Sequence, residues 1–413
     1  MATAAVGAPA FSTLLLRAER FDRQLDELHL DLLVGADFES MREQYTIADD
    51  VTYLNHASIG TVPRPVQEAH RDYLAICETN PWLYMWGGAW DAPREAVRGA
   101  VAAFLNSDAA SIAITHNTTE AFNVLAHGLP LGHGDEVLYS TLNHSGASIA
   151  FEHVGEARGF TARRFEFPSL EVAGMASADV IDLYEKQITD DTRLLVLPHI
   201  DNTVGLRHPV MEIAAAARAR GVDWVAVDGA QTAGMIDVDL DALGVDVFAT
   251  SAHKWLQTPK GLGVTYYSQT VREVLRPMWV TWGQKWFKEA MRFEDYGTRN
   301  MPELLSLGDA IEFQSNVTVE KRTARLAALR DLAKELAHEN PRTTWRSPER
   351  WPMGGSLFAI EISGAKSADL AKSMFAHHGF VFRPFEIDGV QTVRISPNVF
   401  TSEREIRRFF DLV

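Results

Sequence analysis

One lysine stands where a covalent cofactor could be attached to the protein. Lys254 lies in the segment Ser251-Ala-His-Lys254, directly after an apolar run that is typical of a buried strand. In open α/β sheets, ligands bind outside the carboxyl ends of the strands. Partial burial at such a place lowers the pKa of a lysine and makes its amine a nucleophile that can form a Schiff base with a carbonyl group. Taken alone, a solvated surface lysine is the more common interpretation of such a position.

A carboxylate and a pair of hydroxyls stand at the ends of two other predicted elements. Asp228 ends the apolar run Trp224–Asp228. A carboxylate opposite the nitrogen of a pyridine ring keeps that nitrogen protonated, so that the ring can accept electrons. Thr118 and Thr119 precede an apolar helix, where hydroxyls and free backbone N–H groups can hold a phosphate. Both segments have a simpler interpretation, because Asp is a common helix N-cap and Thr followed by Glu120 makes a capping box.

Two further polar positions follow strands of the same kind. His144 comes after the run at 136–140, where its imidazole could stack on a cofactor ring, and Asn202 follows the buried run Leu194–Ile200. Because the carboxyl ends of parallel strands share one edge of a sheet, all five sites should lie together. Five such sites at one edge are less expected by chance than any single one, so the pattern favours a phosphate-bearing pyridine cofactor.

Amphipathic helices alternate with short apolar strands from about residue 93 onward. The expected strands are residues 136–140, 194–200, 224–228, 245–250 and 263–268. Apolar runs separated by helices predict an α/β fold whose sheet is mostly parallel and covered by helices on both faces. After about residue 300 the pattern changes to an α+β tail. We therefore expect an N-terminal arm at 1–50 that joins the small domain, a large cofactor-binding domain at 51–300 and a small C-terminal domain at 301–413.

Composition argues against several other classes of protein. The 413 residues include 39 basic and 55 acidic side chains, and the formal charge of −16 argues against a nucleic-acid partner. The single cysteine, Cys77, allows neither an internal disulfide nor a cysteine-rich metal site. With no His-Glu-x-x-His cluster, no Gly-x-Gly-x-x-Gly turn after a first strand and no Walker A loop, we expect neither a metal centre nor a nicotinamide-dependent dehydrogenase. The sequence shows no basic leader and no apolar run of bilayer length, so we expect a cytoplasmic protein without a membrane partner.

The order of these segments resembles the class V aminotransferase superfamily of fold-type I pyridoxal-5′-phosphate (PLP) enzymes. In chain order, the matching segments are Asn117-Thr-Thr-Glu-Ala, Asn143-His, His199-x-x-Asn-x-x-Gly, Val227-Asp-Gly-Ala-Gln and Ser251-x-His-Lys. The spacing of the last two is the most specific, and the resemblance extends from about Thr52 to the C-terminus. It implies a PLP cofactor, a large domain built on a mostly parallel sheet of the seven-stranded type, and a smaller α+β C-terminal domain.

The resemblance also assigns roles to single residues around the cofactor. Lys254 would hold PLP as a Schiff base, Asp228 would pair with the pyridinium nitrogen, and His144 would stack on the ring. The remaining cofactor-binding residues are Asn202 and Gln231 at the phenolic oxygen and Thr118, Thr119, Ser251 and His253 at the phosphate. Thr298, in Tyr-Gly-Thr-Arg, belongs to a segment like the one that a second subunit contributes to the phosphate, which implies a homodimer with a shared active site.

Substrate-binding residues follow from the same resemblance. Arg394, in Val-Arg-Ile-Ser, matches the arginine that binds the α-carboxylate of an amino acid through a bidentate pair. Arg383 is a second candidate for that role. Asn55 and His56 lie in the stretch Tyr53-Leu-Asn-His-Ala-Ser-Ile-Gly, which most resembles the isopenicillin N epimerase-like branch, and we expect them at the substrate site.

Cysteine desulfurases are similar overall, but they carry a catalytic cysteine in a loop between the two C-terminal strands. The corresponding region, Arg383–Gln391, has no cysteine, and Cys77 lies far upstream in a helix-like segment. Three reactions remain open: β-elimination or related oxidative chemistry on a cysteine S-conjugate, epimerisation, and transamination. A protein of another class, a PLP-binding sensor or scaffold without catalysis, is disfavoured by the combination of Lys254, Asp228 and Arg394.

Aromatic residues are dense in two stretches, 81–90 and 280–287, which hold five of the ten tryptophans. Aromatic walls suit a bulky, partly apolar substrate. We therefore expect C–S bond processing of a large cysteine S-conjugate in secondary metabolism. A dimer interface or a packed core is the alternative interpretation of these tryptophans.

Overall fold

A seven-stranded sheet forms the centre of the larger part of the protein. The computed structural model describes residues 39–413, so most of the arm predicted at 1–50 lies outside the described residues. Within this range the strand order is β2 (Ile112–Thr115), β8 (Gly263–Tyr267), β7 (Val247–Thr250), β6 (Trp224–Asp228), β5 (Thr192–Pro198), β3 (Glu136–Ser140) and β4 (Thr161–Phe165). β8 is antiparallel to its neighbours β2 and β7, and the other neighbouring strands are parallel. The predicted α/β fold with a mostly parallel sheet is confirmed.

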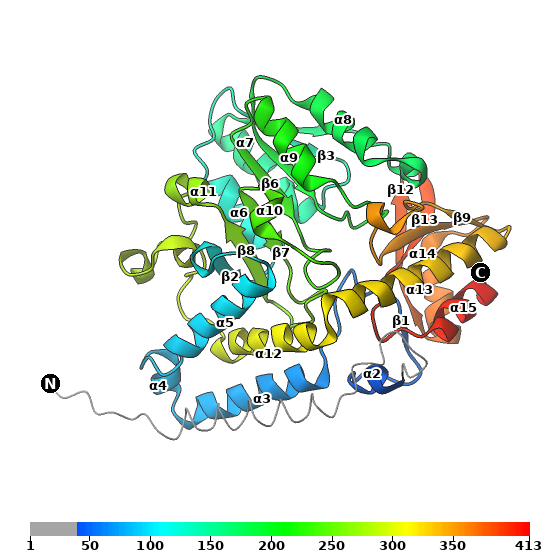
Figure 1. Ribbon diagram of the computed structural model, residues 1–413, viewed down its shortest axis with the longest axis horizontal. Coiled ribbons are helices and arrows are strands. Elements are labelled where there is room, and N and C mark those ends of the chain that lie inside the picture. The colour runs from blue at the N-terminus through cyan, green and yellow to red at the C-terminus, as the bar shows by residue number, and fades with distance from the viewer. Residues whose placement is uncertain (1–38) are drawn as a thin grey trace.

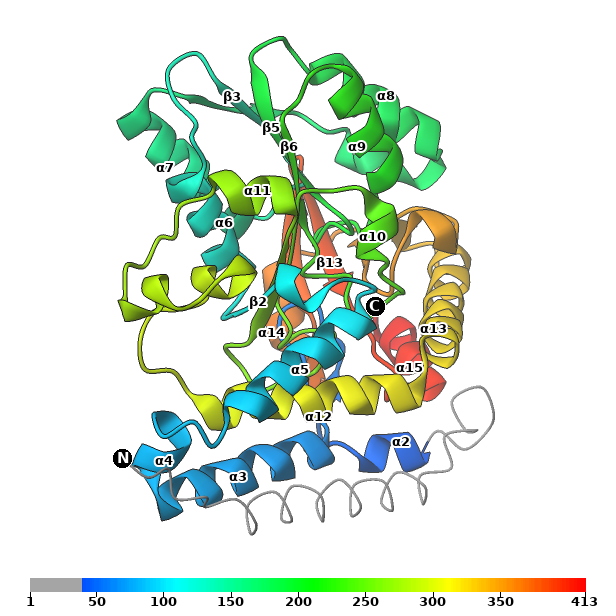
Figure 2. The same ribbon diagram turned by 60° about the vertical axis from the view of Figure 1, so that its left-hand side comes forward.

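Helices cover both faces of this sheet (Figures 1 and 2). The core on one face is closed by α6 (Thr118–Gly128), α7 (Ile149–Arg158) and α11 (Gln269–Val274). The core on the other face is closed by α5 (Asp91–Phe104), α8 (Ser177–Gln187), α9 (Val210–Ala219), α10 (Leu240–Leu243) and α12 (Met301–Val317). Successive residues of β5 serve the two cores in turn: Leu194 and Val196 belong to the first, Leu195 and Leu197 to the second. A strand buried on both faces is apolar throughout, which explains the continuous runs in the sequence.

A second, antiparallel sheet lies near the C-terminal end of the chain. Its order is β12 (Arg383–Ile387), β13 (Val390–Ile395), β10 (Phe358–Ile362) and β9 (Thr343–Trp345). Its helices are α13 (Val319–Glu339), α14 (Ser367–His378) and α15 (Glu403–Leu412), which share a separate core with it. Two short parallel strands, β1 (Thr52–Tyr53) and β11 (Phe380–Val381), bring the early part of the chain to this region. An early segment therefore reaches residues that come more than three hundred positions later.

The long helix α12 packs against α5 and against α3 (Arg64–Thr79), and its apolar residues belong to a core of the large sheet. The domain division at residue 300 stays a prediction.

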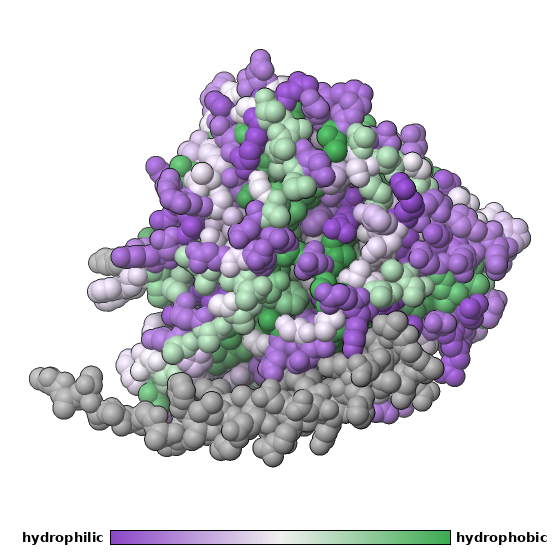
Figure 3. Space-filling model, in the orientation of Figure 1, coloured by the Kyte–Doolittle hydropathy of each residue, from purple (hydrophilic) through white to green (hydrophobic). Residues whose placement is uncertain are grey.

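Apolar side chains gather over α5 and the adjacent part of α12 on the face shown in Figure 3, where a groove of about 620 Å³ lies between the two helices. The other helical elements are α2 (Glu39–Glu43), α4 (Pro81–Met85), η2 (Ala109–Ser111), η3 (Ser145–Ala147), η4 (Ser169–Gly174), η5 (Trp282–Lys285), η6 (Glu289–Phe293) and η7 (Trp351–Met353). From residue 39 onward, no helix is long and apolar enough to cross a membrane.

Candidate active site

The parallel strands of the large sheet end at one edge, and the segments that follow them carry the predicted cofactor-binding residues. β2, β3, β5, β6 and β7 share this direction, whereas β8 begins at the same edge because it runs the opposite way. The topology therefore brings Thr118, His144, Asn202, Asp228 and Lys254 to one side of the sheet.

Lys254 lies in the turn after β7, with its backbone N–H 3.0 Å from the carbonyl oxygen of Ser251. Burial lowers the pKa of its amine to about 8. The Asp228 carboxylate acts in the opposite direction, the positive charges of Arg394 and Arg383 act together with burial, and the pKa of about 8 is the net result. Lys254 therefore has a far larger neutral fraction at neutral pH than an exposed lysine, as a nucleophile or a base requires.

We expect the amine of Lys254 in the cofactor-free protein to react with an acylating reagent along a pH curve with its midpoint near the pKa of about 8. Lysines in model peptides titrate near about 10.4, so this midpoint should lie roughly two pH units below that ordinary value. Brief labelling across a pH series, with mass-spectrometric quantification of the peptide that contains Lys254, measures the midpoint. Replacement of Asp228 by asparagine should move the Lys254 midpoint down, because the carboxylate favours the ammonium form. A Lys254 midpoint at the ordinary lysine value of about 10.4, or an upward move in the variant, would contradict this.

The segment from Asn55 to Gly60 fixes the backbone that carries this amine. His56 Nε2 lies 3.0 Å from the carbonyl oxygen of Lys254, and the N–H of Gly60 donates to the carbonyl of His253 at 3.0 Å. A Cβ atom on Gly60 would lie 2.0 Å from the Lys254 carbonyl oxygen. The close approach of the two backbones therefore requires glycine at this position.

His56 is the one predicted substrate-binding residue whose side chain is completely buried. Its side chain is 0% exposed and packs against Trp255, with the ring centroids 4.9 Å apart. Burial lowers the pKa of His56 to about 3, so the imidazole is neutral. The assignment of His56 to the substrate site stays a prediction, and within the described residues its ring supports the loop of Lys254.

Arg394 lies in β13 and is 2% exposed. Its guanidinium donates to the carbonyl oxygen of Asn202 at 2.7 Å, to Asn55 Oδ1 at 3.2 Å and to Ser58 Oγ at 2.6 Å. Burial and the neighbouring positive charge of Arg383 together lower its pKa to about 9. The segment that holds Lys254 thus also orients Arg394, and Asn55 acts through this arginine.

Thr118 and Ser251 lie face to face although they are far apart in the sequence. Their hydroxyl oxygens are 3.0 Å apart, and Ser251 Oγ also accepts the N–H of Thr118 at 3.2 Å. Thr118 is the first residue of α6, so the positive end of the helix dipole points at the same place. Thr119 is exposed beside Gly146, where a Cβ would lie 2.5 Å from Thr119 Oγ1. Hydroxyls and free N–H groups at a helix N-terminus suit a phosphate group.

Asp228 and His144 lie next to this hydroxyl cluster. Asp228 is 6% exposed, and one of its oxygens accepts the N–H of Ala230 at 2.9 Å. Among residues 39–413 its second oxygen has no hydrogen bond or ion pair, so an acceptor is left for a ligand. His144 Nδ1 accepts the N–H of Gly146 at 3.0 Å, which leaves the proton of the neutral ring on Nε2. Burial lowers the pKa of His144, the Asp228 carboxylate raises it, and the charge of Lys254 lowers it, with a net decrease.

Gln231 and His253 make most of their contacts within the protein. Gln231 Oε1 accepts the indole N–H of Trp255 at 2.7 Å, and its Nε2 donates to the carbonyl of Ala57 at 2.9 Å, which leaves one amide N–H for a ligand. His253 Nδ1 lies 3.1 Å from the carbonyl oxygen of Leu262, and burial lowers the pKa of His253 to about 4. Their roles at the cofactor stay predictions.

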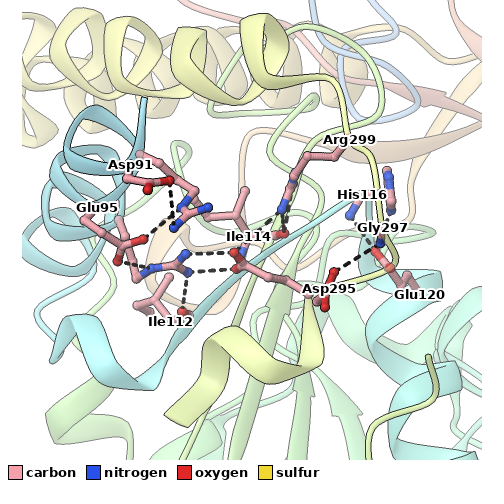
Figure 4. A network of polar contacts seen from close by, with 12 residues as sticks. Asp91, Glu95, Ile112, Ile114, His116, Glu120, Asp295, Gly297 and Arg299 are labelled. Atoms are coloured by element: carbon pink, nitrogen blue, oxygen red, sulfur yellow. Dashed lines mark hydrogen bonds and ion pairs between the residues drawn. The ribbon is translucent and has the colours of Figure 1, made fainter. Parts of the chain in front are cut away.

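A buried ion pair anchors the segment that carries Thr298 (Figure 4). Glu294 accepts two N–H groups of Arg98 at 2.7 and 2.8 Å, together with the backbone N–H of Ile114 at 2.5 Å. Arg299 donates to the carbonyl oxygen of Ile114 at 3.1 Å. Ile114 belongs to β2, which leads into α6, so the segment lies beside the strand that precedes the hydroxyl cluster.

A cavity of about 590 Å³ opens beside this segment. Its lining includes Trp86, Trp282, Trp286, Phe287, Thr298 and Arg299, so the two aromatic stretches of the sequence meet here. Tyr296 packs against His116, with ring centroids 4.5 Å apart, and His116 directly precedes the N-terminal turn of α6. The aromatic cavity therefore neighbours the candidate phosphate site.

Residues 52–408 match the sequence profile of a family described as aminotransferase class V. The chain belongs to the class V aminotransferase family. It is accordingly a PLP-dependent enzyme.

Named relatives of this member of the class V aminotransferase family have different activities. The chain is similar to isopenicillin N epimerase of Streptomyces clavuligerus, with 28% identity over 398 residues that span 91% of this chain and 97% of the relative. It is also similar to a probable cysteine desulfurase of Halobacterium salinarum, with 28% identity over 368 residues and 85% of each chain. Among solved structures, a C-DES variant with glycine covalently linked to its PLP cofactor has a TM-score of 0.82 at 24% identity, over 90% of this chain and 98% of that one. The apo cysteine desulfurase of Thermococcus onnurineus NA1 has a TM-score of 0.77 at 21% identity, over 91% and 96% of the two chains.

The residues of the site fit PLP in three respects. Asp228 offers a buried carboxylate oxygen, as a pyridinium nitrogen needs. Thr118 and Ser251 place hydroxyls at a helix N-terminus, as a phosphate needs. Lys254 offers an amine with a lowered pKa, as a carbonyl group needs.

Several residues that shape the site were not singled out in the sequence. Ser58 lies inside the stretch 53–60 that resembles the family, so its polar side chain could have been predicted to face the site. Arg98 and Glu294 are 196 residues apart, and nothing in the local pattern of either connects them. Phe385, whose ring lies beneath the guanidinium of Arg394, likewise has no local signal.

Proposed function

We propose that the enzyme removes the Cα hydrogen of a cysteine S-conjugate and eliminates the sulfur substituent from Cβ, so that addition of water gives a thiol, pyruvate and ammonia. The aromatic cavity beside the candidate phosphate site carries this proposal. Its volume of about 590 Å³ and its tryptophan lining suit a bulky, partly apolar group on sulfur. A role for these conjugates in secondary metabolism is part of the same proposal.

The protein residues divide the work of such a reaction between binding and proton transfer. PLP, when bound, supplies an electron sink that acidifies the hydrogen on Cα. Arg394 binds the α-carboxylate, because its buried guanidinium is already oriented by Asn55 and Ser58. Lys254 accepts the proton from Cα with its neutral amine, since its pKa of about 8 lies close to neutral pH.

Elimination needs one proton acceptor at Cα, whereas epimerisation also needs a proton donor on the other face. His144 is the neighbouring candidate for that donor. Its lowered pKa keeps it neutral, and a neutral imidazole is a poor acid. The pairing of a proton-accepting lysine with a neutral histidine therefore favours elimination.

Transfer of sulfur to a cysteine of the enzyme does not fit this chain. The hairpin between β12 and β13 turns through Asp388 and Gly389, and Cys77 is buried within α3. Buried in the core, its thiol has no route to the sheet edge of Lys254. The C–S bond is therefore broken by elimination alone.

Epimerisation at Cα is the second candidate. The similarity to isopenicillin N epimerase over 97% of that protein favours it. Both reactions begin with Lys254 and separate only after the proton has left Cα.

We expect incubation with S-benzylcysteine to release pyruvate and benzyl thiol. Substitution of Trp282 or Trp286 by alanine should raise KM about tenfold, because the aromatic surface that a bound substituent would cover then contributes roughly 1.4 kcal/mol less. Trp279 is exposed but does not line the cavity, so Trp279→Ala is the matched control and should leave KM nearly unchanged. Recovery of substrate with solvent deuterium at Cα and no pyruvate would instead support epimerisation.

A homodimer is proposed on the basis of exposed apolar surface. Trp82, which does not line the aromatic cavity, is more than half exposed, and the groove between α5 and α12 is lined mainly by small and apolar residues. Exposed apolar patches of this kind mark interaction sites. A second copy of the chain would cover them and bring Thr298 toward a neighbouring active site. The cytoplasmic location stays a prediction.

A further inference from the structure

Two arginines lie directly opposite each other on neighbouring strands of the C-terminal sheet. Arg383 of β12 pairs with Arg394 of β13 in the antiparallel register, so both side chains emerge on the same face. The guanidinium carbon of Arg383 lies 5.1 Å from the ring centroid of Phe385, and that of Arg394 lies 5.2 Å from the same centroid. Two positive charges therefore converge on one aromatic ring.

Like charges at directly opposite positions destabilise a sheet. Cation–π contact with Phe385 offsets part of this cost. Within residues 39–413 no carboxylate forms an ion pair with either arginine. An uncompensated pair of this kind suits a site where the ligand supplies the negative charge.

The two arginines differ in how many of their hydrogen-bond donors remain available to a ligand. Arg394 is buried and already donates to three acceptors of the protein. Arg383 is exposed, and in the described part of the chain it has no hydrogen bond and no ion pair. Its donors are therefore free, on the solvent side of the buried arginine.

Arg383 also lies within reach of the reacting centre. Its positive charge, like that of Arg394, lowers the pKa of both Lys254 and His144. The two guanidinium groups thus both lie near enough to the candidate base and the histidine to act on their charges, with Arg394 buried and Arg383 exposed.

We propose that Arg383 binds a second anionic group of the substrate, so that the preferred amino acid carries a carboxylate or similar anion on its side chain. Arg394 binds the α-carboxylate, and Arg383 binds the anion on the substituent. This inference rests on the proposed function for the placement of an amino acid at Arg394, and it narrows the S-conjugate to one with an acidic group on sulfur. Arg383 is then a specificity-determining residue.

The test compares a matched pair of ligands that cannot react at Cα. S-(carboxybenzyl)-α-methylcysteine and S-(carbamoylbenzyl)-α-methylcysteine have the same shape, and only the first has a second negative charge. Their dissociation constants are measured by calorimetry on the PLP-loaded enzyme. We expect the acid to bind about tenfold more tightly than the amide, as a charge-assisted hydrogen bond allows.

Arg383→Gln should bring the ratio of the two dissociation constants close to one, and Arg383→Lys should keep part of the preference. Arg404→Gln, which removes an exposed arginine of α15, is the control and should keep all of it. A ratio near one in the unaltered enzyme overturns the proposal. So does an Arg383→Gln variant that binds both ligands less tightly by the same factor, because that result places Arg383 at the α-carboxylate.

Two different measurements distinguish failure of this inference from failure of the proposed elimination. Pyruvate release from conjugates that keep the Cα hydrogen tests the reaction, whereas the calorimetric ratio tests only the second anion. An enzyme that forms no pyruvate but prefers the acid through Arg383 would therefore support this inference against the elimination.

Discussion

Replacement of Lys254 by alanine should remove the visible absorption of the PLP-loaded protein and lower turnover by roughly 10²- to 10⁴-fold or more. The amine of Lys254 is the candidate both for covalent attachment of the cofactor and for proton transfer at Cα, and its lowered pKa of about 8 suits both tasks. Absorption spectra of the purified protein and initial rates with S-benzylcysteine measure the two effects.

Two further variants separate this role from a general effect of charge. Lys254→Arg keeps a positive charge but cannot form the covalent bond, so it should also lose the absorption band. Lys260 lies six residues later, and burial lowers its pKa as well, so Lys260→Ala is the matched control that should keep the band. A Lys254→Ala protein that retains both colour and turnover, or an unaltered protein that gains no band with PLP, would refute the assignment.

The strands that carry the site could be predicted because burial on both faces makes them continuously apolar. Leu194–Leu197 and Val225–Val227 show this pattern, and both lie in the middle of the sheet. β4 lies at the edge and reads Thr-Ala-Arg-Arg-Phe, so it has no apolar run to find. β2 is only four residues long, and its sequence Ile-Ala-Ile-Thr was likewise missed.

Contacts between distant segments were harder to predict than the strands themselves. Asn55 and His56 were assigned together to the substrate site, yet successive residues of an extended segment point to opposite sides. The side chain of Asn55 contacts Arg394, whereas that of His56 enters the core beside Trp255. A sequence motif identifies the segment at a site, but it does not show which of two adjacent residues points its side chain toward the ligand.

The segment from Asn55 to Gly60 fixes the positions of Lys254 and Arg394 relative to each other. It contacts the backbone around Lys254 through His56 and Gly60, and it contacts Arg394 through Asn55 and Ser58. A shift of this segment would therefore change the distance between the base and the carboxylate-binding group. Catalysis depends on such positioning as much as on the identity of the reacting groups.

Replacement of Glu294 by glutamine should lower the free energy of unfolding by about 3 kcal/mol, because the buried guanidinium of Arg98 then keeps only the partly exposed Glu95 as an ionic partner. Both side chains are at most 5% exposed, and Glu294 also accepts the N–H of Ile114 in β2. Urea denaturation of the two proteins measures the difference. Lys186 and Asp182 form an exposed ion pair in α8, so Asp182→Asn is the control and should cost less than about 1 kcal/mol.

The pH dependence gives this prediction a second, independent measurement. Burial raises the pKa of Glu294, but the adjacent Arg98 outweighs burial, and the net pKa lies below its ordinary value. A carboxylate with a lowered pKa in the folded protein contributes stability that is complete above its unfolded pKa of about 4.3 and is lost as the pH falls through the folded pKa. The difference between Glu294→Gln and the unaltered protein should therefore be constant near neutral pH and shrink in acid.

The double variant with Arg98→Met and Glu294→Leu should recover most of the lost stability, because it removes both charges together. Recovery should stop about 1–3 kcal/mol short, since the N–H of Ile114 then lacks its acceptor. If the double variant were instead less stable than Glu294→Gln alone, packing around the pair would account for the loss, and the buried charge would not.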